Sequence, residues 1–355
     1  MPVPLLEGIR AKTITTPRLT TRVLFSGDDS GTPVLFLHGN SSSATWWEPV
    51  MLSLPAAFLG IALDQRGYGD ADPSAKINAP RGMSDFADDA LALINTLGYE
   101  KVHVVGLSMG GSIVWQLLMD APERFLSVTV INPGSPYGFG SSKDATGTPT
   151  YPDGAGSGAG LVFPVVVQPM IDRDMGTDSP FSPRNRLRGL YVNPAFVNPY
   201  EDQWLESFLS THLGAQDFPG DYVPSANYPF TAPGIWGANN ALSRKYVPDL
   251  TPLYAKNPKH TILWIRGSHD TVVSDMSMRD IGTLAKLGLL PMIPNYPGPE
   301  IFPPQPMLAQ TRAVLETYKA HEGDYREEII MDAGHVPYLE KSDAFNALLH
   351  AHLQK

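Results

Sequence analysis

The stretch VHVVGLSMGGSIVWQLL, residues 102–118, changes abruptly from a run typical of a buried strand to a pattern typical of an amphipathic helix. Ser108 occupies the turn between them, and glycines flank it at Gly106 and Gly110. Small residues at those two positions let the backbone take a tight, strained turn that lifts a serine clear of a sheet. We therefore expect a strand–turn–helix unit with Ser108 at its tip.

The same alternation of strand-like and helix-like segments extends along much of the chain. Short apolar or β-branched runs predict strands at 10–15, 20–26, 34–38, 61–64, 102–105, 126–131, 261–266 and 327–331. Apolar residues at helical spacing predict helices over 86–97, after an N-cap at Ser84, and over 109–120 and 342–353. Strands that alternate with helices imply crossover connections, so the expected fold class is α/β: a mostly parallel, doubly wound sheet with helices on both faces.

Two irregular segments interrupt this rhythm. Residues 134–249 are rich in Gly, Pro, Ser and aromatic residues, although 201–213 has helical spacing. A loop of this length inside a compact domain is usually a functional excursion, so we interpret 134–249 as a cap or lid inserted into a core formed by 1–133 and 250–355. A second, proline-rich excursion, 288–306, separates the last two predicted strands.

Composition excludes several classes of function. The chain has 355 residues, 43% of them hydrophobic, so it can bury a large core. Its formal net charge of −10 argues against a nucleic-acid-binding surface, and the absence of cysteine excludes disulfides, thiolate metal sites and cysteine nucleophiles. We see neither a basic leader nor a run of about 18 apolar residues. The expectation is a cytoplasmic protein without a membrane span.

A serine nucleophile needs a base, and the base needs a group that holds its tautomer. His335 follows the predicted strand 327–331, and Asp270 follows the strand 261–266, so both belong to the end of the sheet that carries Ser108. Asp275 is the alternative acid. Other histidines compete as the base, but we expect them to be packed or solvated: these include His38, His103, His350 and His352.

Several short motifs together resemble those of the α/β-hydrolase superfamily. They are HGN at 38–40, DQRGYGDAD at 64–72, GLSMG at 106–110, GSHD at 267–270 and AGHVPYLE at 333–340. The resemblance covers the predicted core and leaves the cap unmatched. It implies that the backbone N–H groups of Asn40 and Met109 form an oxyanion hole, and that Asp64 and Arg66 belong to the scaffold.

The resemblance implies hydrolysis of a carboxylic ester through an acyl-enzyme. His335 would take the proton of Ser108, Asp270 would stabilise the imidazolium, and neither a metal nor an organic cofactor would take part. A lactonase or a hydrolase of carbon–carbon bonds is the alternative on the same triad. An aminopeptidase-like amide hydrolase and a non-catalytic binding protein are less favoured, and Ser108 contradicts an aspartate nucleophile. The expected partner is a small-molecule ester or lactone, and the oligomeric state stays open.

Aromatic residues provide candidates for a substrate pocket. Those we select are Trp46, Trp47, Trp204 and Trp236. Trp46 and Trp47 follow the HGN motif and either border the acyl pocket or simply pack. The segment RNRLR, 184–188, places three arginines close together, which we interpret as a solvated basic face; recognition of a substrate carboxylate is the alternative.

Overall fold

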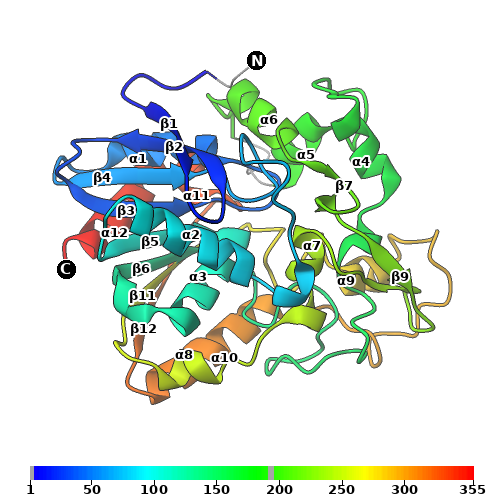
Figure 1. Cartoon of the computed structure of the whole chain (residues 1–355). Helices are drawn as coiled ribbons and strands as arrows, with labels where there is room; N and C mark the ends of the chain where they lie inside the picture. The colour runs from blue at the N-terminus through cyan, green and yellow to red at the C-terminus, as the bar shows by residue number, and fades with distance from the viewer. Residues whose placement is uncertain (1–3, 191–195) are drawn as a thin grey trace.

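A sheet of eight strands forms the centre of the molecule, which we describe from a computed structural model covering residues 4–190 and 196–355 (Figure 1). The strand order is β1-β2-β4-β3-β5-β6-β11-β12. The pairs β1–β2 and β2–β4 are antiparallel and the other pairs are parallel, as the sequence predicts. The strands are β1 (Arg10–Thr15), β2 (Thr20–Ser26), β3 (Thr32–Leu37), β4 (Phe58–Leu63), β5 (Val102–Leu107), β6 (Phe125–Ile131), β11 (Thr261–Gly267) and β12 (Asp324–Ile330).

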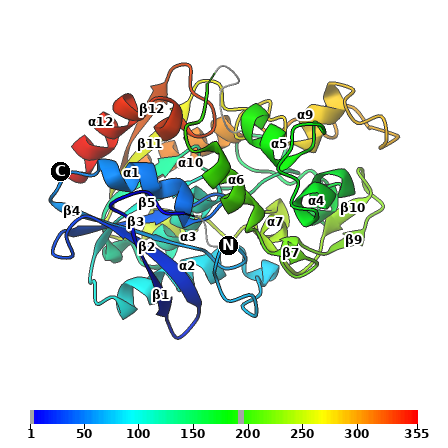
Figure 2. The same cartoon turned by 90° about the horizontal axis from the view of Figure 1, so that it is seen from above.

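Helices cover both faces of this sheet, and the side chains of the inner strands alternate between two cores. On β3, Leu35 and Leu37 enter the core shared with α2, α3, α8 and α10. Val34 and Phe36 enter the core shared with α1 and α12. Figure 2 shows α1 and α12 on the other side of the sheet from α2. The doubly wound arrangement is therefore confirmed. The helices are α1 (Glu48–Ser53), α2 (Ser84–Thr96), α3 (Met109–Asp120), α8 (Thr251–Ala255), α10 (Met307–Ala320), α11 (Pro337–Glu340) and α12 (Ser342–Leu353).

Several element boundaries differ from the prediction; strand β4, for example, begins at Phe58 and not at residue 61. The last strand, β12, begins at Asp324, earlier than predicted, because it pairs only with β11 at the edge of the sheet and leaves Arg326 and Glu328 partly exposed. Burial therefore does not mark its start in the sequence. Helix α2 already includes Ser84, whose side chain makes no capping hydrogen bond, and Met83 occupies the N-cap position.

The described parts of segment 134–249 lie together with segment 271–306, which contains the predicted excursion 288–306, beyond one end of the sheet (Figure 2). The first contains α4 (Pro164–Ile171), α5 (Pro183–Leu190), α6 (Glu201–Leu209), α7 (Ala238–Ala241), β7 (Leu213–Gly214), β8 (Phe218–Pro219), β9 (Tyr222–Pro224) and β10 (Thr231–Pro233); the second contains α9 (Ile281–Lys286). Helix α6 ends before residue 213 and packs Trp204 and Phe208 into the core of α1 and α12. The division into core and cap stays a prediction. None of the helices in the described ranges combines enough length and apolar character to cross a lipid bilayer.

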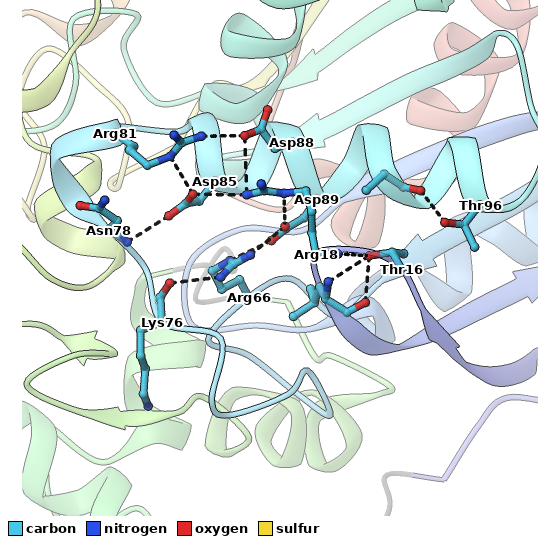
Figure 3. Close-up of polar contacts among 12 residues, drawn as sticks. Thr16, Arg18, Arg66, Lys76, Asn78, Arg81, Asp85, Asp88, Asp89 and Thr96 are labelled. Carbon is cyan, nitrogen blue, oxygen red and sulfur yellow. Dashed lines mark hydrogen bonds and ion pairs between the residues drawn. The ribbon is translucent and has the colours of Figure 1, made fainter.

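Ion pairs connect the segment after β4 to helix α2 (Figure 3). Arg66 donates to both carboxylate oxygens of Asp89 at 2.8 Å, and Arg18 donates to the same carboxylate at 3.0 Å. Asp89 is buried, so the two guanidinium groups compensate its charge. Asp64, also buried, accepts hydrogen bonds from the Arg22 side chain and from the backbone of two loops. Asp64 therefore holds backbone in place, and Arg66 does so through the carbonyl of Lys76, to which it donates at 3.2 Å.

Candidate active site

Ser108 forms the whole connection between β5 and α3, and its backbone is strained. Its φ of 55° and ψ of −116° lie where residues with a side chain are rarely found. A Cβ at Gly106 would collide with the backbone of Gly110, and a Cβ at Gly110 would collide with the carbonyl of Leu37. Only glycine fits at both positions. The close approach holds the turn tight, and Ser108 stands at the carboxyl end of the sheet.

Asp270 and His335 meet at the ends of two neighbouring parallel strands, β11 and β12. The Nδ1 of His335 lies 2.9 Å from Oδ2 of Asp270, and both side chains are buried. The other carboxylate oxygen accepts hydrogen bonds from the N–H groups of Val272 at 2.7 Å and Val273 at 3.0 Å. With Nδ1 donating to the carboxylate, Nε2 is the ring nitrogen able to accept a proton.

The alternative acid lies elsewhere. Asp275 is exposed, and its Oδ1 accepts hydrogen bonds from the backbone N–H groups of Leu308 at 2.8 Å and Ala309 at 3.2 Å. These groups belong to the first turn of α10, which lacks internal acceptors for its N–H groups. The carboxylate of Asp275 therefore caps a helix, whereas that of Asp270 faces His335.

Of the four competing histidines named above, His38, His103 and His352 are buried, whereas His350 is partly exposed. His38 is fully buried, and burial lowers its pKa to about 4, so the ring is neutral. Its Nε2 accepts from the N–H of Gln65 at 3.0 Å; Nδ1 therefore carries the proton and donates to the carbonyl of Gly39 at 2.8 Å. Burial likewise lowers the pKa of His103 and His352 to about 4. Of the histidines in the described ranges, His335 is the one that lines the cavity beside Ser108.

Asn40 and Met109 line the same cavity as Ser108. Met109 is the first residue of α3, so its N–H has no acceptor within the helix. A Cβ on Gly39 would lie 3.3 Å from the Cβ of Ser108, so the loop that carries Asn40 passes directly beside the serine. Both N–H groups belong to backbone that adjoins the hydroxyl, as an oxyanion hole requires.

The cavity has a volume of about 850 Å³, which suits a ligand of substantial size. The segment 134–249 forms one wall with residues such as Leu161, Val162, Phe163 and Val166, and the segment 271–306 forms another with Val272, Val273, Ile281, Leu284 and Leu290. The second wall was not foreseen, because 250–355 was assigned to the core. Val165, Phe181, Leu289 and Met292 line the cavity and are 42–65% exposed, so its mouth is apolar as well.

One of the four predicted tryptophans reaches this cavity. Trp46 lines it and stacks on Trp204, with ring centroids 4.3 Å apart. Trp47, the next residue of the same short 3-10 helix (Ala44–Trp47), is buried against Tyr338. Trp47, Trp204 and Trp236 are not among the residues that line the cavity. Periodicity could not decide this, because neighbouring residues in a tight turn face different surroundings.

The three arginines of RNRLR lie in two different environments. Arg184 and Arg188 form ion pairs with Glu201 at the start of α6. Arg188 is exposed as a basic face predicts, whereas the side chain of Arg184 is only 15% exposed. Arg186 is buried, lines the cavity and places its guanidinium 5.1 Å from the ring centre of Phe208. Within the described ranges, no three His, Asp or Glu side chains are grouped so that they could hold a metal ion.

Sequence reasoning missed Asn132, which follows β6. Its side-chain amide donates to the carbonyls of His335 at 2.7 Å and Gly334 at 3.2 Å, and its Oδ1 accepts from the N–H of Gly267 at 3.1 Å. Asn132 therefore joins the end of β11 to the loop that follows β12. A buried polar residue at the carboxyl end of a central strand was the available signal.

Similarity to known proteins agrees with the fold described above. A family model described as the alpha/beta hydrolase fold matches residues 32–292. An uncharacterized carboxylesterase, nap, of Bacillus subtilis (strain 168) is 25% identical over 68% of this chain and 77% of its own length. The carboxylesterase YbfK of the same strain is 32% identical, over 33% of this chain and 39% of its own length.

Solved structures share the fold. The crystal structure of carboxylesterase CesB (YbfK) from Bacillus subtilis aligns with a TM-score of 0.57 and 17% identity, covering 97% of this chain and 91% of that one. A 2-hydroxy-6-oxo-6-phenylhexa-2,4-dienoate hydrolase from Rhodococcus sp. strain RHA1 aligns with a TM-score of 0.59 and 18% identity, covering 98% and 99%. At these identities the likeness concerns the fold alone.

Proposed function

This chain belongs to the alpha/beta hydrolase fold family and is a hydrolytic enzyme; on that premise we propose that it cleaves a carboxylic ester through an acyl-enzyme. The observation that carries the proposal is the Asp270–His335 hydrogen bond of 2.9 Å, on a cavity that Ser108 also lines. An acid, a base and a strained serine at the ends of three strands are what nucleophilic acyl transfer needs.

In the first half of the reaction, Nε2 of His335 takes the proton of Ser108 as Oγ attacks the ester carbonyl carbon. The N–H groups of Asn40 and Met109 donate to the oxyanion, and the imidazolium returns the proton to the leaving alcohol. Water then attacks the acyl-enzyme with the same histidine as base, and the acid leaves. Asp270 stabilises the imidazolium without taking its proton, because two N–H groups and the ring already hydrogen-bond its carboxylate.

The cavity supports an ester with a large apolar part. Its volume of about 850 Å³ and its apolar walls and mouth stabilise alkyl or aryl groups by removing them from water. The curated relatives named as carboxylesterases support the same bond type. An amide substrate with a free amine is less well served, because the carboxylate at the cavity wall, Asp280, already accepts from Thr283 and Gln305.

The proposal is tested by labelling with a fluorophosphonate and by substrate panels. We expect one equivalent of label on Ser108 by peptide mass spectrometry, and neither label nor esterase activity in Ser108→Ala. Label on another residue, or none, would contradict the serine mechanism. If the enzyme acts on lactones or on carbon–carbon substrates but not on p-nitrophenyl esters, the proposed substrate changes from a carboxylic ester to one of those classes.

A further inference from the structure

Tyr68 touches both residues of the proposed oxyanion hole. It lies in the turn after β4, within the DQRGYGDAD motif, and is 1% exposed. Its hydroxyl donates to Oδ1 of Asn40 at 2.7 Å and lies 3.7 Å from Sδ of Met109. A phenol has a single proton. The Tyr68 hydroxyl donates it to the amide oxygen of Asn40, and the sulfur of Met109 only packs against the phenol oxygen.

The side chain of Asn40 is held at its other end too. Its Nδ2 donates to Oδ1 of Asn239 at 2.7 Å, and Asn239 belongs to α7 and lines the cavity. Hydrogen bonds thus lead from Tyr68 through Asn40 to Asn239. They connect the turn after β4, the loop after β3 and the segment 134–249, which are distant in sequence.

The loop that carries Asn40 has reason to need such support. It lies between the end of β3 and a short 3-10 helix, and the next residue, Ser41, has a φ of 53°. A positive φ is unfavourable for a residue with a side chain, and it persists only where surrounding contacts hold the backbone in place. On one side, the neutral His38 donates to the carbonyl of Gly39; on the other, Tyr68 and Asn239 hold the Asn40 side chain.

We propose that Tyr68 is a positioning residue for the oxyanion hole, acting through the side chain of Asn40, with Asn239 as the second anchor. The inference rests on the proposed function, since it assigns a purpose to the N–H of Asn40. Donors stabilise an oxyanion only when they already point at the place where its charge develops. The ester carbonyl of the bound substrate carries little charge and depends on this geometry much less.

The first test is Tyr68→Phe, which removes the hydroxyl and keeps the ring that packs edge-on against His38. We expect kcat for a p-nitrophenyl ester to fall by about 10- to 100-fold while KM changes by less than about twofold, because the lost interaction serves the transition state. Asn239→Leu should lower kcat in the same way. An unchanged kcat in Tyr68→Phe, or a rise in KM alone, overturns the inference.

A double-mutant cycle tests whether Tyr68 acts through Asn40. In Asn40→Ala the backbone N–H remains but the side chain that Tyr68 holds is gone. Tyr68→Phe should then have no further effect on kcat, within about twofold. Fully additive losses would mean that the hydroxyl acts by another route and would overturn the inference.

Tyr318→Phe is the matched control. Its buried hydroxyl also donates one hydrogen bond, to the carbonyl of His260, and it accepts another from the N–H of the same residue. Tyr318 belongs to α10, packs beside the start of β11 and does not line the cavity. We expect a similar loss of stability with unchanged kcat; an equal fall in kcat in both variants would overturn the inference. Fluorophosphonate labelling of Ser108 in the unmodified protein separates the two proposals. Without that label the proposed function fails, whereas label together with an unaffected Tyr68→Phe removes only this inference.

Discussion

The side-chain amide of Asn132 donates a hydrogen bond to the backbone carbonyl of His335 at 2.7 Å. The same side chain accepts from the N–H of Gly267 at 3.1 Å, three residues before Asp270. Asn132, which directly follows β6, therefore connects the loop of the proposed base with the end of β11, from which the loop of the proposed acid begins. The spacing of that pair depends on a third strand as well as on their own hydrogen bond.

Asn132→Ala should lower the free energy of unfolding by about 1–3 kcal/mol, because it leaves buried polar groups without partners. We also expect kcat for an ester to fall tenfold or more as the histidine loop loses its anchor. Urea denaturation and steady-state kinetics measure the two effects. Thr129→Val in β6 is the control, since within the described ranges the buried Thr129 hydroxyl has no hydrogen-bond partner. Equal kcat values in the two variants would contradict this prediction.

Asp270→Asn and Asp275→Asn separate the two candidate acids. Replacement of Asp270 removes the charge that orients and stabilises the histidine, so kcat should fall by about 10⁴-fold. Replacement of Asp275 weakens the cap of α10 and should cost at most about 1 kcal/mol of stability, with kcat unchanged. Ester kinetics and thermal unfolding of both variants decide the matter. Loss of turnover in Asp275→Asn alone would reverse the assignment.

Gly110→Ala should prevent the turn around Ser108 from closing. The added Cβ would overlap the carbonyl of Leu37, which β3 holds in place, so we expect a loss of several kcal/mol of stability or no folded protein. Gly189→Ala in α5 is the control, because its added Cβ meets no atom within 4 Å and alanine favours a helix. Thermal unfolding of both variants tests this. A Gly110→Ala protein as stable as the control would be inconsistent with the described turn.

Val162→Trp should restrict the cavity to esters with short acyl chains. Val162 lines the wall formed by 134–249, and a larger ring there fills volume that a long acyl chain would otherwise occupy. We expect kcat/KM for p-nitrophenyl decanoate to fall at least tenfold and that for the acetate to stay within about twofold. The ratio of the two values is the measurement. An equal fall for both esters would show that the substitution disturbs the catalytic groups instead.

Buried histidines predict how stability changes with pH. Burial lowers the pKa of His38, His103 and His352 to about 4, whereas an unfolded histidine titrates near pH 6.5. Between these values the unfolded chain binds more protons, so the free energy of unfolding falls as the pH drops. Each such histidine contributes a loss of about 2 kcal/mol between pH 7 and pH 5.

Urea unfolding at the two pH values measures this loss. His103→Gln is the informative variant, since its amide can still hydrogen-bond to the Ser127 hydroxyl that His103 now contacts. Its stability should depend less on pH than that of the unmodified protein. The same dependence in both proteins would contradict the assignment for His103.

Local pattern predicted the central unit because each part of it follows from backbone chemistry. A β-branched run, a glycine-flanked serine and an amphipathic helix indicate β5, Ser108 and α3 whatever surrounds them. Chain order then indicated the ends of β11 and β12 as the places for Asp270 and His335. The pairing of those two side chains is a tertiary property that no spacing in the sequence encodes.

The sequence could not show which side chains line the cavity. Trp46 and Trp47 are neighbours with the same chemistry, and only the packing of α6 and α11 against them decides which one faces the cavity. The wall formed by 271–306 lacks long periodic elements, so its residues carried no signal of their position. Asn132 and Tyr68 were hidden for another reason, because their roles depend on partners far away in the chain.

Both walls of the cavity consist largely of chain without long helices or strands, and buried amides hold much of it. Gln305 accepts from the N–H of Gly140 and donates to the carbonyl of Gly138, and Gln310 donates to Ser142. The shape of the cavity is thus set by a few polar anchors behind it, and the apolar side chains in front only cover its surface. Directed evolution toward new esters should therefore tolerate exchanges among the apolar side chains and fail at the glutamines.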